Sequence, residues 1–407
     1  MKNIGIINTF SHTKSTGKIA YGLYKQLRKK NNCTLFYGEP EEEVLTDDNV
    51  ICLNTKFEKK LHVFESVLFG NQGEYSYKET FKLIKEIRKR NIEYLYLFNI
   101  HGYYLNYPIL FHYIAKHKIK VIYTMLDEYA YMGKCCFALE CDKYKYECNN
   151  CPLISDYPKS IFFDRSKHIF KLKKRLYSKI SDITFVSIPY IVQRAKESAL
   201  LKNHSFVELE EGIDLKNIYY PRNTEQLRKR LGIEDTKIVI LLVAPFSFER
   251  KGARYFLEVA RQYEQDERFV FINVGFDVDP IICPSNFIPI SYVSNQEELA
   301  EYYSLADCFV CTSLAETVAD TCLEALACGT PVIGFSCAGL PYSVKEKHCQ
   351  FVTACDVDAL CYLINNIKKK DKEIMLSCRK YAEDKFDFEH YMKSLENLIE
   401  DTIDMSE

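Results

Sequence analysis

The chain has 407 residues, too many for one ordinary hydrophobic core, so two domains are expected. Hydrophobic residues make up 47% and charged residues 27%, as in globular proteins, and the net charge of −2 gives no support for nucleic acid as a partner. The first residues, MKNIGIINTF, predict a short strand rather than a signal peptide. No apolar run reaches the ~20 residues of a membrane helix. We therefore expect a cytoplasmic protein.

The N-terminal half alternates predicted strands and helices, as a doubly wound α/β domain does. A strand is predicted at Asn3 to Asn8 and a helix at Ile19 to Arg28, with the loop SHTKSTGK between them. A glycine in such a loop lets a ligand approach the backbone, so Gly17 is a candidate binding residue. An ordinary turn is the alternative.

His101 is the next candidate, because it follows the predicted strand YLYLF within the segment NIHGYYLN. The carboxyl ends of parallel strands face ligands in open sheets. A histidine there can orient a substrate hydroxyl, and a histidine with a purely structural role is an equal alternative.

A cysteine-rich insertion follows at 135–151, with the spacing C-x5-C-x6-C-x2-C. The residues concerned are Cys135, Cys141, Cys148 and Cys151. Four thiolates suit a structural zinc ion. Free thiols are an equal alternative, and Cys136 is an alternative ligand.

Residues 164–180 form a predicted basic amphipathic helix with seven Lys or Arg against one Asp. Such a helix can lie on anionic lipid, which would give peripheral membrane contact. The simpler alternative is a surface helix whose apolar side faces the core. The cations that would then contact lipid are Lys171, Lys173, Lys174, Arg175 and Lys179.

A second domain is predicted to begin near Ile213, because Gly212 and Pro221 mark a connector. In this domain the loop FERKG follows a strand predicted at Lys237 to Ala244. Lys251 in this loop would point a compact cation toward a ligand, for which a diphosphate is an obvious partner. A solvated lysine is the alternative.

The stretch 306–344 predicts strand, helix and strand, with the helix from Thr317 to Cys328. Free backbone N–H groups at a helix start bind anions, which makes Thr317 and Val318 candidate phosphate contacts. Glu316 and Glu324 are separated by seven residues. Glu324 lies in the apolar segment CLEALA, where its carboxylate needs donors such as a ribose diol or a neighbouring Lys.

The motif S-x-x-E-x7-E-A-x-A-C-G-T-P-V resembles the retaining GT-B glycosyltransferases of family four. F-x-x-R-K-G, followed by a helix, resembles the K-G step of the same family. Two further segments, NIHGYYLN and the cysteine-rich insertion, are similar to segments of its exopolysaccharide and colanic-acid-assembly branch. The resemblance implies two Rossmann-like domains, 1–212 and 213–385, facing each other across a cleft. A C-terminal helix within 386–407 would then pack back on the first domain.

The resemblance also implies site roles, with Glu316 contacting the donor sugar, Lys251 the donor diphosphate and Glu324 the nucleotide ribose. Arg250 is a substitute for an Arg that the family has earlier in the loop. Leu126 stands where the family has a His near the donor sugar, and Asp127 follows it as a further binding candidate.

The function implied by this resemblance is transfer of a sugar, with retention of configuration, from a UDP- or GDP-sugar. The acceptor would be a saccharide, in the favoured version lipid-linked, used in cell-surface polysaccharide synthesis at the inner face of the membrane. No cofactor is required for this catalysis. The alternative is a non-catalytic, glycosyltransferase-like subunit that stabilises a partner, which Leu126 makes credible.

Overall fold

The computed structural model describes residues 1–43, 45–278 and 283–401. The chain divides into two compact units, Met1–Leu209 with Met392–Glu407, and Glu210–Tyr391. The chain passes from the first unit to the second after Leu209, and the sequence predicted this boundary near Ile213. Of the predicted C-terminal segment, residues 402–407 lie outside the described residues.

The first unit is built on a seven-stranded sheet of order β3-β2-β1-β4-β5-β6-β7, in which every neighbouring pair is parallel. Its strands are β1 Asn3–Asn8, β2 Asn32–Tyr37, β3 Val50–Cys52, β4 Tyr94–Leu97, β5 Lys120–Thr124, β6 Ile183–Ser187 and β7 Ser205–Glu208. The order reverses between β1 and β4. In open α/β sheets, ligands bind beyond the carboxyl ends of the strands at such a reversal.

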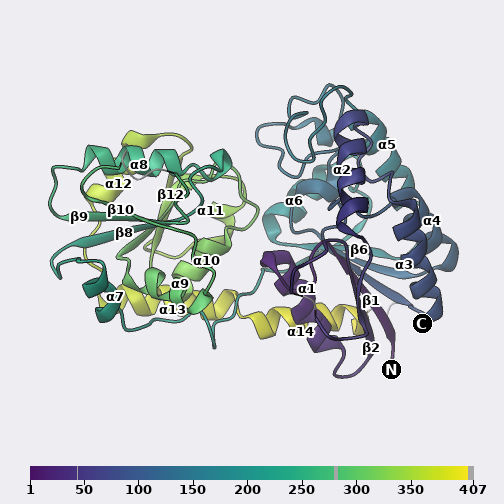
Figure 1. The fold of residues 1–407 in the computed structure, drawn as a ribbon, viewed down its shortest axis with the longest axis horizontal. Coiled ribbons are helices and arrows are strands. Elements are labelled where there is room, and N and C mark those ends of the chain that lie inside the picture. Colours follow the sequence, from purple (N-terminus) through teal and green to yellow (C-terminus); the bar gives the residue numbers. More distant parts are fainter. Residues whose placement is uncertain (44, 279–282, 402–407) are drawn as a thin grey trace. The chain divides into compact units, whose positions relative to one another are not determined.

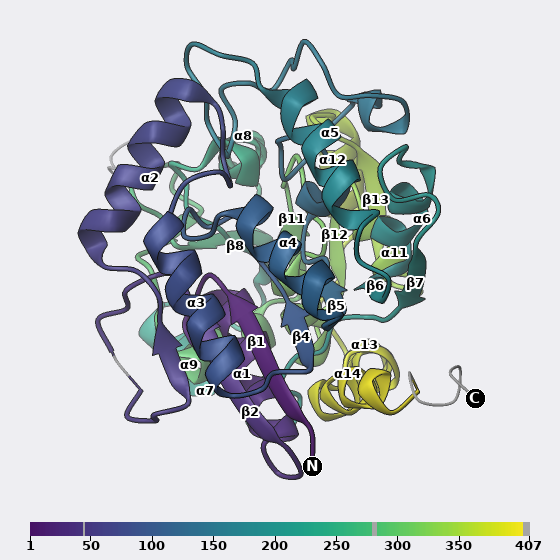
Figure 2. The ribbon, with the colours of Figure 1, turned by 90° about the vertical axis from the view of Figure 1, so that its right-hand side faces the viewer.

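Helices cover both faces of this sheet, and α3, α4 and α5 lie along one of them (Figures 1 and 2). The helices are α1 Lys14–Leu27, α2 Lys56–Phe69, α3 Tyr77–Lys89, α4 Tyr107–His117, α5 Ser166–Tyr177 and α6 Pro189–Glu197. Helix α2 was not expected from the sequence, although Thr55 and Glu58 form a capping box at its start.

The second unit has a six-stranded parallel sheet of order β10-β9-β8-β11-β12-β13. Its strands are β8 Ile238–Val243, β9 Phe269–Val274, β10 Phe287–Ile290, β11 Cys308–Cys311, β12 Val332–Ser336 and β13 Gln350–Thr353. The order reverses between β8 and β11, which fixes the second place where a ligand is expected.

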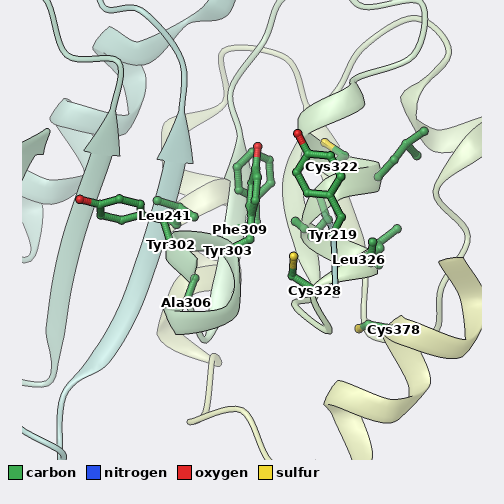
Figure 3. Close-up of a cluster of buried hydrophobic side chains, with 14 of the residues drawn as sticks. Tyr219, Leu241, Tyr302, Tyr303, Ala306, Phe309, Cys322, Leu326, Cys328 and Cys378 are labelled. Carbon is green, nitrogen blue, oxygen red and sulfur yellow. The ribbon is translucent and has the colours of Figure 1, made fainter. Parts of the chain in front are cut away.

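Two apolar layers enclose the second sheet. Tyr303, Phe309 and Leu326 belong to the layer under α9 and α10 (Figure 3), and Phe256 and Leu360 to the layer under α8 and α12. The helices are α7 Glu225–Arg230, α8 Ala253–Gln262, α9 Gln296–Leu305, α10 Asp320–Ala327, α11 Leu340–Ser343, α12 Val357–Asn365 and α13 Lys372–Lys385.

The last helix, α14 Phe388–Asp401, ends in the first unit. The hydroxyl of Tyr96 in β4 donates to the carbonyl oxygen of Leu395 at 2.5 Å, and the amide of Gln26 in α1 donates to Glu396 at 2.7 Å. Across the described residues, no helix combines the length and apolar character needed to span a bilayer.

Candidate functional site

Two loops meet where the second sheet reverses its strand order, one after β8 and one after β11. The first loop ends in a short 3-10 turn, Glu249–Lys251, followed by Gly252 in the left-handed region at φ +66°. A Cβ at Gly252 would lie 2.0 Å from the carbonyl oxygen of Thr312 in the second loop. Glycine is therefore required both by the backbone angle and by the close approach of the loops.

Lys251 and Glu316 form an ion pair across these loops. The Lys251 Nζ donates to Glu316 Oε1 at 2.7 Å, and a guanidinium nitrogen of Arg250 lies 3.3 Å from the same oxygen. Arg250 also donates to the carbonyl oxygen of Ala315, and its own carbonyl accepts from the N–H of Leu314 at 2.8 Å. The structure thus brings together the predicted residues Arg250, Lys251 and Glu316.

Charge pairing sets the ionisation of this group. Burial alone would raise the pKa of Glu316, but the Lys251 ammonium and the Arg250 guanidinium hold it below its usual range. Burial would lower the pKa of Lys251, and the Glu316 carboxylate raises it above the ordinary value instead. The Lys251–Glu316 pair is therefore ionised at neutral pH.

The helix after Glu316 starts later than the sequence predicted. α10 begins at Asp320, so Thr317 and Val318 lie in the preceding loop and not in the first helical turn. The side chain of Asp320 occupies the first turn, and a negative charge there opposes a second anion. Thr317 is buried, and its hydroxyl has no hydrogen-bond partner within the described residues.

Two phenols hold Glu324. The Tyr303 hydroxyl donates to Glu324 Oε2 at 2.7 Å, and Tyr219, whose hydroxyl accepts from Gln296 at 3.0 Å, also hydrogen-bonds to this carboxylate. Both phenol oxygens point the same way in Figure 3. Burial and the adjacent Glu324 charge raise the pKa of Tyr219. No spacing in the sequence would have identified either tyrosine, since both lie on other elements.

In the first unit, His101 and Asp127 meet beyond the ends of β4 and β5. His101 Nε2 lies 3.2 Å from Asp127 Oδ2, and His101 is only 4% exposed. The other carboxylate oxygen of Asp127 accepts from the N–H of Tyr129 at 2.9 Å, which caps a 3-10 turn at Glu128–Tyr131. Two residues 26 positions apart in the sequence are thus neighbours.

Gly17 lies inside α1, not in the loop where the sequence placed it, because α1 begins at Lys14. A Cβ at Gly17 would lie 3.0 Å from Phe10 Cβ and 3.1 Å from the carbonyl carbon of His12. Gly17 therefore packs the helix against the preceding loop. Sequence reasoning missed Glu41, whose carboxylate accepts from the N–H of Ser11 at 3.0 Å.

The four cysteines of the insertion are free thiols in this structure. No three of their sulfur atoms lie within 4.8 Å of one another in the described part of the chain. Burial raises the pKa of Cys148 to about 11, with a smaller contribution in that direction from Cys141 and Cys151. The cysteines are thus electrostatic neighbours, and zinc binding by this set stays a prediction.

The basic helix differs from its prediction at one residue. Lys173 in α5 is 2% exposed, and its ammonium donates to the carbonyl oxygens of Tyr129 at 2.6 Å and Met132 at 3.1 Å. It also lies 3.2 Å from the centre of the Tyr129 ring. Lys173 is therefore a core residue that cannot contact lipid, although Lys171, Lys174, Arg175 and Lys179 are exposed.

Comparison with known proteins places this architecture among glycosyltransferases. Residues 223–385 match the family described as glycosyl transferases group 1. The HepE protein of Anabaena, solved in complex with UDP, superposes with a TM-score of 0.67 at 13% identity, covering 98% of this chain and 100% of that one. The fold is that of the GT-B glycosyltransferases.

Two curated relatives resemble part of the chain. The alpha-monoglucosyldiacylglycerol synthase of Acholeplasma laidlawii is 31% identical over 171 residues, 39% of this chain and 42% of that protein. The putative colanic acid biosynthesis glycosyl transferase WcaC of Escherichia coli is 27% identical over 120 residues, 28% of each chain. The chain thus spans less than half the length of these relatives.

Proposed function

We propose that the protein transfers a sugar from a nucleotide-sugar donor to a saccharide acceptor, with retention of anomeric configuration. The observation that carries this proposal is the Lys251–Glu316 ion pair at the strand-order reversal of the second sheet. Donor binding is assigned to this unit because Arg250, Lys251, Glu316 and Glu324 all belong to it.

The chemistry follows from charge. When the bond between the sugar and the diphosphate breaks, negative charge develops on the departing phosphate oxygen, and a preorganised cation lowers the energy of that state. Lys251 is the residue placed for this role, with Glu316 left to accept hydrogen bonds from sugar hydroxyls. The acceptor hydroxyl forms the new bond on the face that the nucleotide leaves, and its proton goes to the departing phosphate.

Glu324 is proposed as the ribose contact. A carboxylate in an apolar helix is stable only with hydrogen-bond donors, and Tyr303 supplies one of them at 2.7 Å. A ribose diol would supply two more. UDP-sugars are the favoured donor class because HepE, which has a similar fold, was solved with UDP and with UDP-glucose.

A lipid-linked acceptor is proposed from the surface of the first unit. Helix α2 exposes Phe57, Leu61 and Phe64, with 75%, 47% and 62% of each residue accessible. Phe162, 67% exposed, follows Ile161, whose N–H donates to the carbonyl oxygen of Val67 at 3.0 Å. Exposed aromatic side chains near the cations of α5 suit the interface of an anionic membrane.

The experiment is a donor panel. Purified protein is incubated with UDP- and GDP-sugars, and release of nucleoside diphosphate is measured for wild type, Lys251→Ala and Glu316→Gln. Loss of one preorganised contact to developing charge typically costs about 3 kcal/mol, a rate loss of roughly a hundredfold. Melting temperatures of all three proteins are recorded in parallel.

Wild-type rates in both variants would remove the catalytic assignment. Absence of release from every donor by the folded wild-type protein, with or without saccharide acceptors, would instead favour the stabilising-subunit alternative. As a matched control, Lys229→Ala removes an exposed lysine of α7 in the same unit and should leave the rate unchanged.

A further inference from the structure

We propose that His101, Asp127 and Cys136 bind a divalent metal ion of the zinc class. One nitrogen, one oxygen and one sulfur ligand atom from these residues all lie within 4.8 Å of one another, the one such group among the described residues. The site is separate from the four-cysteine set, which shares none of these residues.

The spacing of the three atoms suits a small tetrahedral ion. Bonds of 2.0–2.3 Å at tetrahedral angles place ligand atoms roughly 3.3–3.8 Å apart. His101 Nε2 and Asp127 Oδ2 are 3.2 Å apart, and Cys136 Sγ lies within 4.8 Å of both. A small inward shift of the thiol therefore completes the geometry.

The site is buried. His101 and Cys136 are 4% and 2% exposed, and the narrow space beside His101 and Asp127 admits no water molecule. The same space is lined by Thr124, which is 1% exposed and whose hydroxyl has no hydrogen-bond partner in the described residues. The unpartnered hydroxyl beside His101 and Asp127 is a second sign that this buried space suits a polar occupant.

Neighbouring groups fix the orientation of the ligands, as outer partners do in metal sites. The carbonyl oxygen of His101 accepts from the Gln72 side chain at 2.6 Å, and the imidazole lies against the Tyr129 ring with centres 4.6 Å apart. The carbonyl oxygen of Cys136 accepts from the N–H of Glu128 at 3.0 Å. Together with the N–H of Tyr129, which donates to Asp127, these contacts hold the three ligand residues without the ion.

Metal binding requires the loss of one proton, from the Cys136 thiol. The sulfur–hydrogen bond of Cys136 breaks, a metal–sulfur bond forms, and the proton leaves to solvent. The ion then joins the cysteine-rich segment to the ends of β4 and β5, so its role is to hold that segment on the sheet. If His101 is a ligand, its imidazole is not free to contact a sugar hydroxyl.

The test uses untagged full-length protein. Zinc content is measured by elemental analysis, and chelator-treated protein is titrated with Co²⁺ while the sulfur-to-cobalt absorption band is followed. We expect one ion at this site, with the band intensity of a single thiolate. Cys136→Ser should abolish the band, and His101→Asn should weaken binding at least tenfold, while Cys33→Ser, which changes a buried thiol of β2 in the same unit, leaves both signals unchanged.

Unchanged Zn²⁺ content and Co²⁺ band in Cys136→Ser and His101→Asn would overturn the proposal. So would a band that disappears in Cys148→Ser but not in Cys136→Ser, because the ion would then belong to the four-cysteine set. Circular dichroism of the metal-free variants checks folding, and Asp127→Asn gives a third ligand variant if Cys136→Ser does not fold. None of these readouts depends on transferase activity.

Discussion

The loops that follow β8 and β11 touch at Gly252, and this contact gives the first prediction. Gly252→Ala puts a Cβ against the carbonyl oxygen of Thr312 and forces an unfavourable backbone angle, so the loops must separate. We expect a loss of roughly 1–3 kcal/mol in the free energy of unfolding and a large loss of turnover, since Lys251 moves with the loop.

Gly232→Ala is the matched control for this prediction. Gly232 has nearly the same angle, φ +68° against +66°, but a Cβ there meets no atom within 4 Å. Its cost is limited to the backbone angle, about 1 kcal/mol, with turnover retained. Urea denaturation and initial rates measure both variants, and equal losses in the two would show that the contact with Thr312 does not matter.

The Glu316 carboxylate gives a prediction about acid stability. Its pKa is lowered in the folded protein, so its stabilising contribution is present above the ordinary glutamate range, about 4.3, and is lost as pH falls through the lower folded value. Glu316→Gln should therefore show a smaller fall in the free energy of unfolding between pH 6 and pH 3.5 than wild type. Denaturation at both values measures this.

The control for the acid experiment is Glu234→Gln, which changes an exposed glutamate of the same unit. Its fall between the two pH values should equal that of wild type. If Glu316→Gln also behaves like wild type, the ion pair with Lys251 does not persist in solution.

At the level of elements, α5 separates two kinds of lysine. Replacing the exposed Lys171, Lys174, Arg175 and Lys179 by Gln removes four cations worth about 1 kcal/mol each near an anionic surface. We expect sedimentation with anionic vesicles at low salt to disappear while the melting temperature is unchanged. Failure of the wild-type protein to sediment with such vesicles would contradict the membrane proposal.

Lys173→Gln should show the opposite pattern, with a lower melting temperature and normal vesicle binding. Its ammonium is buried among the carbonyl oxygens of Tyr129 and Met132, so the shorter amide leaves acceptors unsatisfied. The seven basic residues of 164–180 could not be divided by sequence into buried and exposed lysines. Helical spacing predicts which residues share a face, but not what packs against that face.

Strand positions were the best predicted elements, because buried parallel strands are continuous apolar runs. Asn3–Asn8 has the predicted bounds, and the two strands predicted within 306–344 are present as β11 and β12. Helix starts were less accurate: α10 begins at Asp320 and not at Thr317, and α1 begins at Lys14, before Gly17. Where a helix starts depends on the geometry of the preceding loop, which the hydrophobic periodicity of the sequence does not reveal.

For the whole molecule, the sequence predicted the α/β class and the two-part division from length and βα alternation. It also indicated that Lys251 and Glu316 lie at carboxyl ends of strands. Their contact could not be derived from the sequence alone, because it depends on β8 and β11 being adjacent. The pairing of His101 with Asp127 and Cys136 depends in the same way on the adjacency of β4 and β5.

The buried cysteines are distributed over both units, so their labelling rates can report local opening in each unit separately. Cys33 and Cys136 are buried in the first unit, and Cys308, Cys322 and Cys378 in the second. A thiol reagent can modify these sulfurs only when the surrounding structure opens, so each labelling rate reports the opening of one region. Mass spectrometry of peptides would then measure the rate of local opening in each unit. The method is useful here because the protein has no tryptophan to report unfolding by fluorescence.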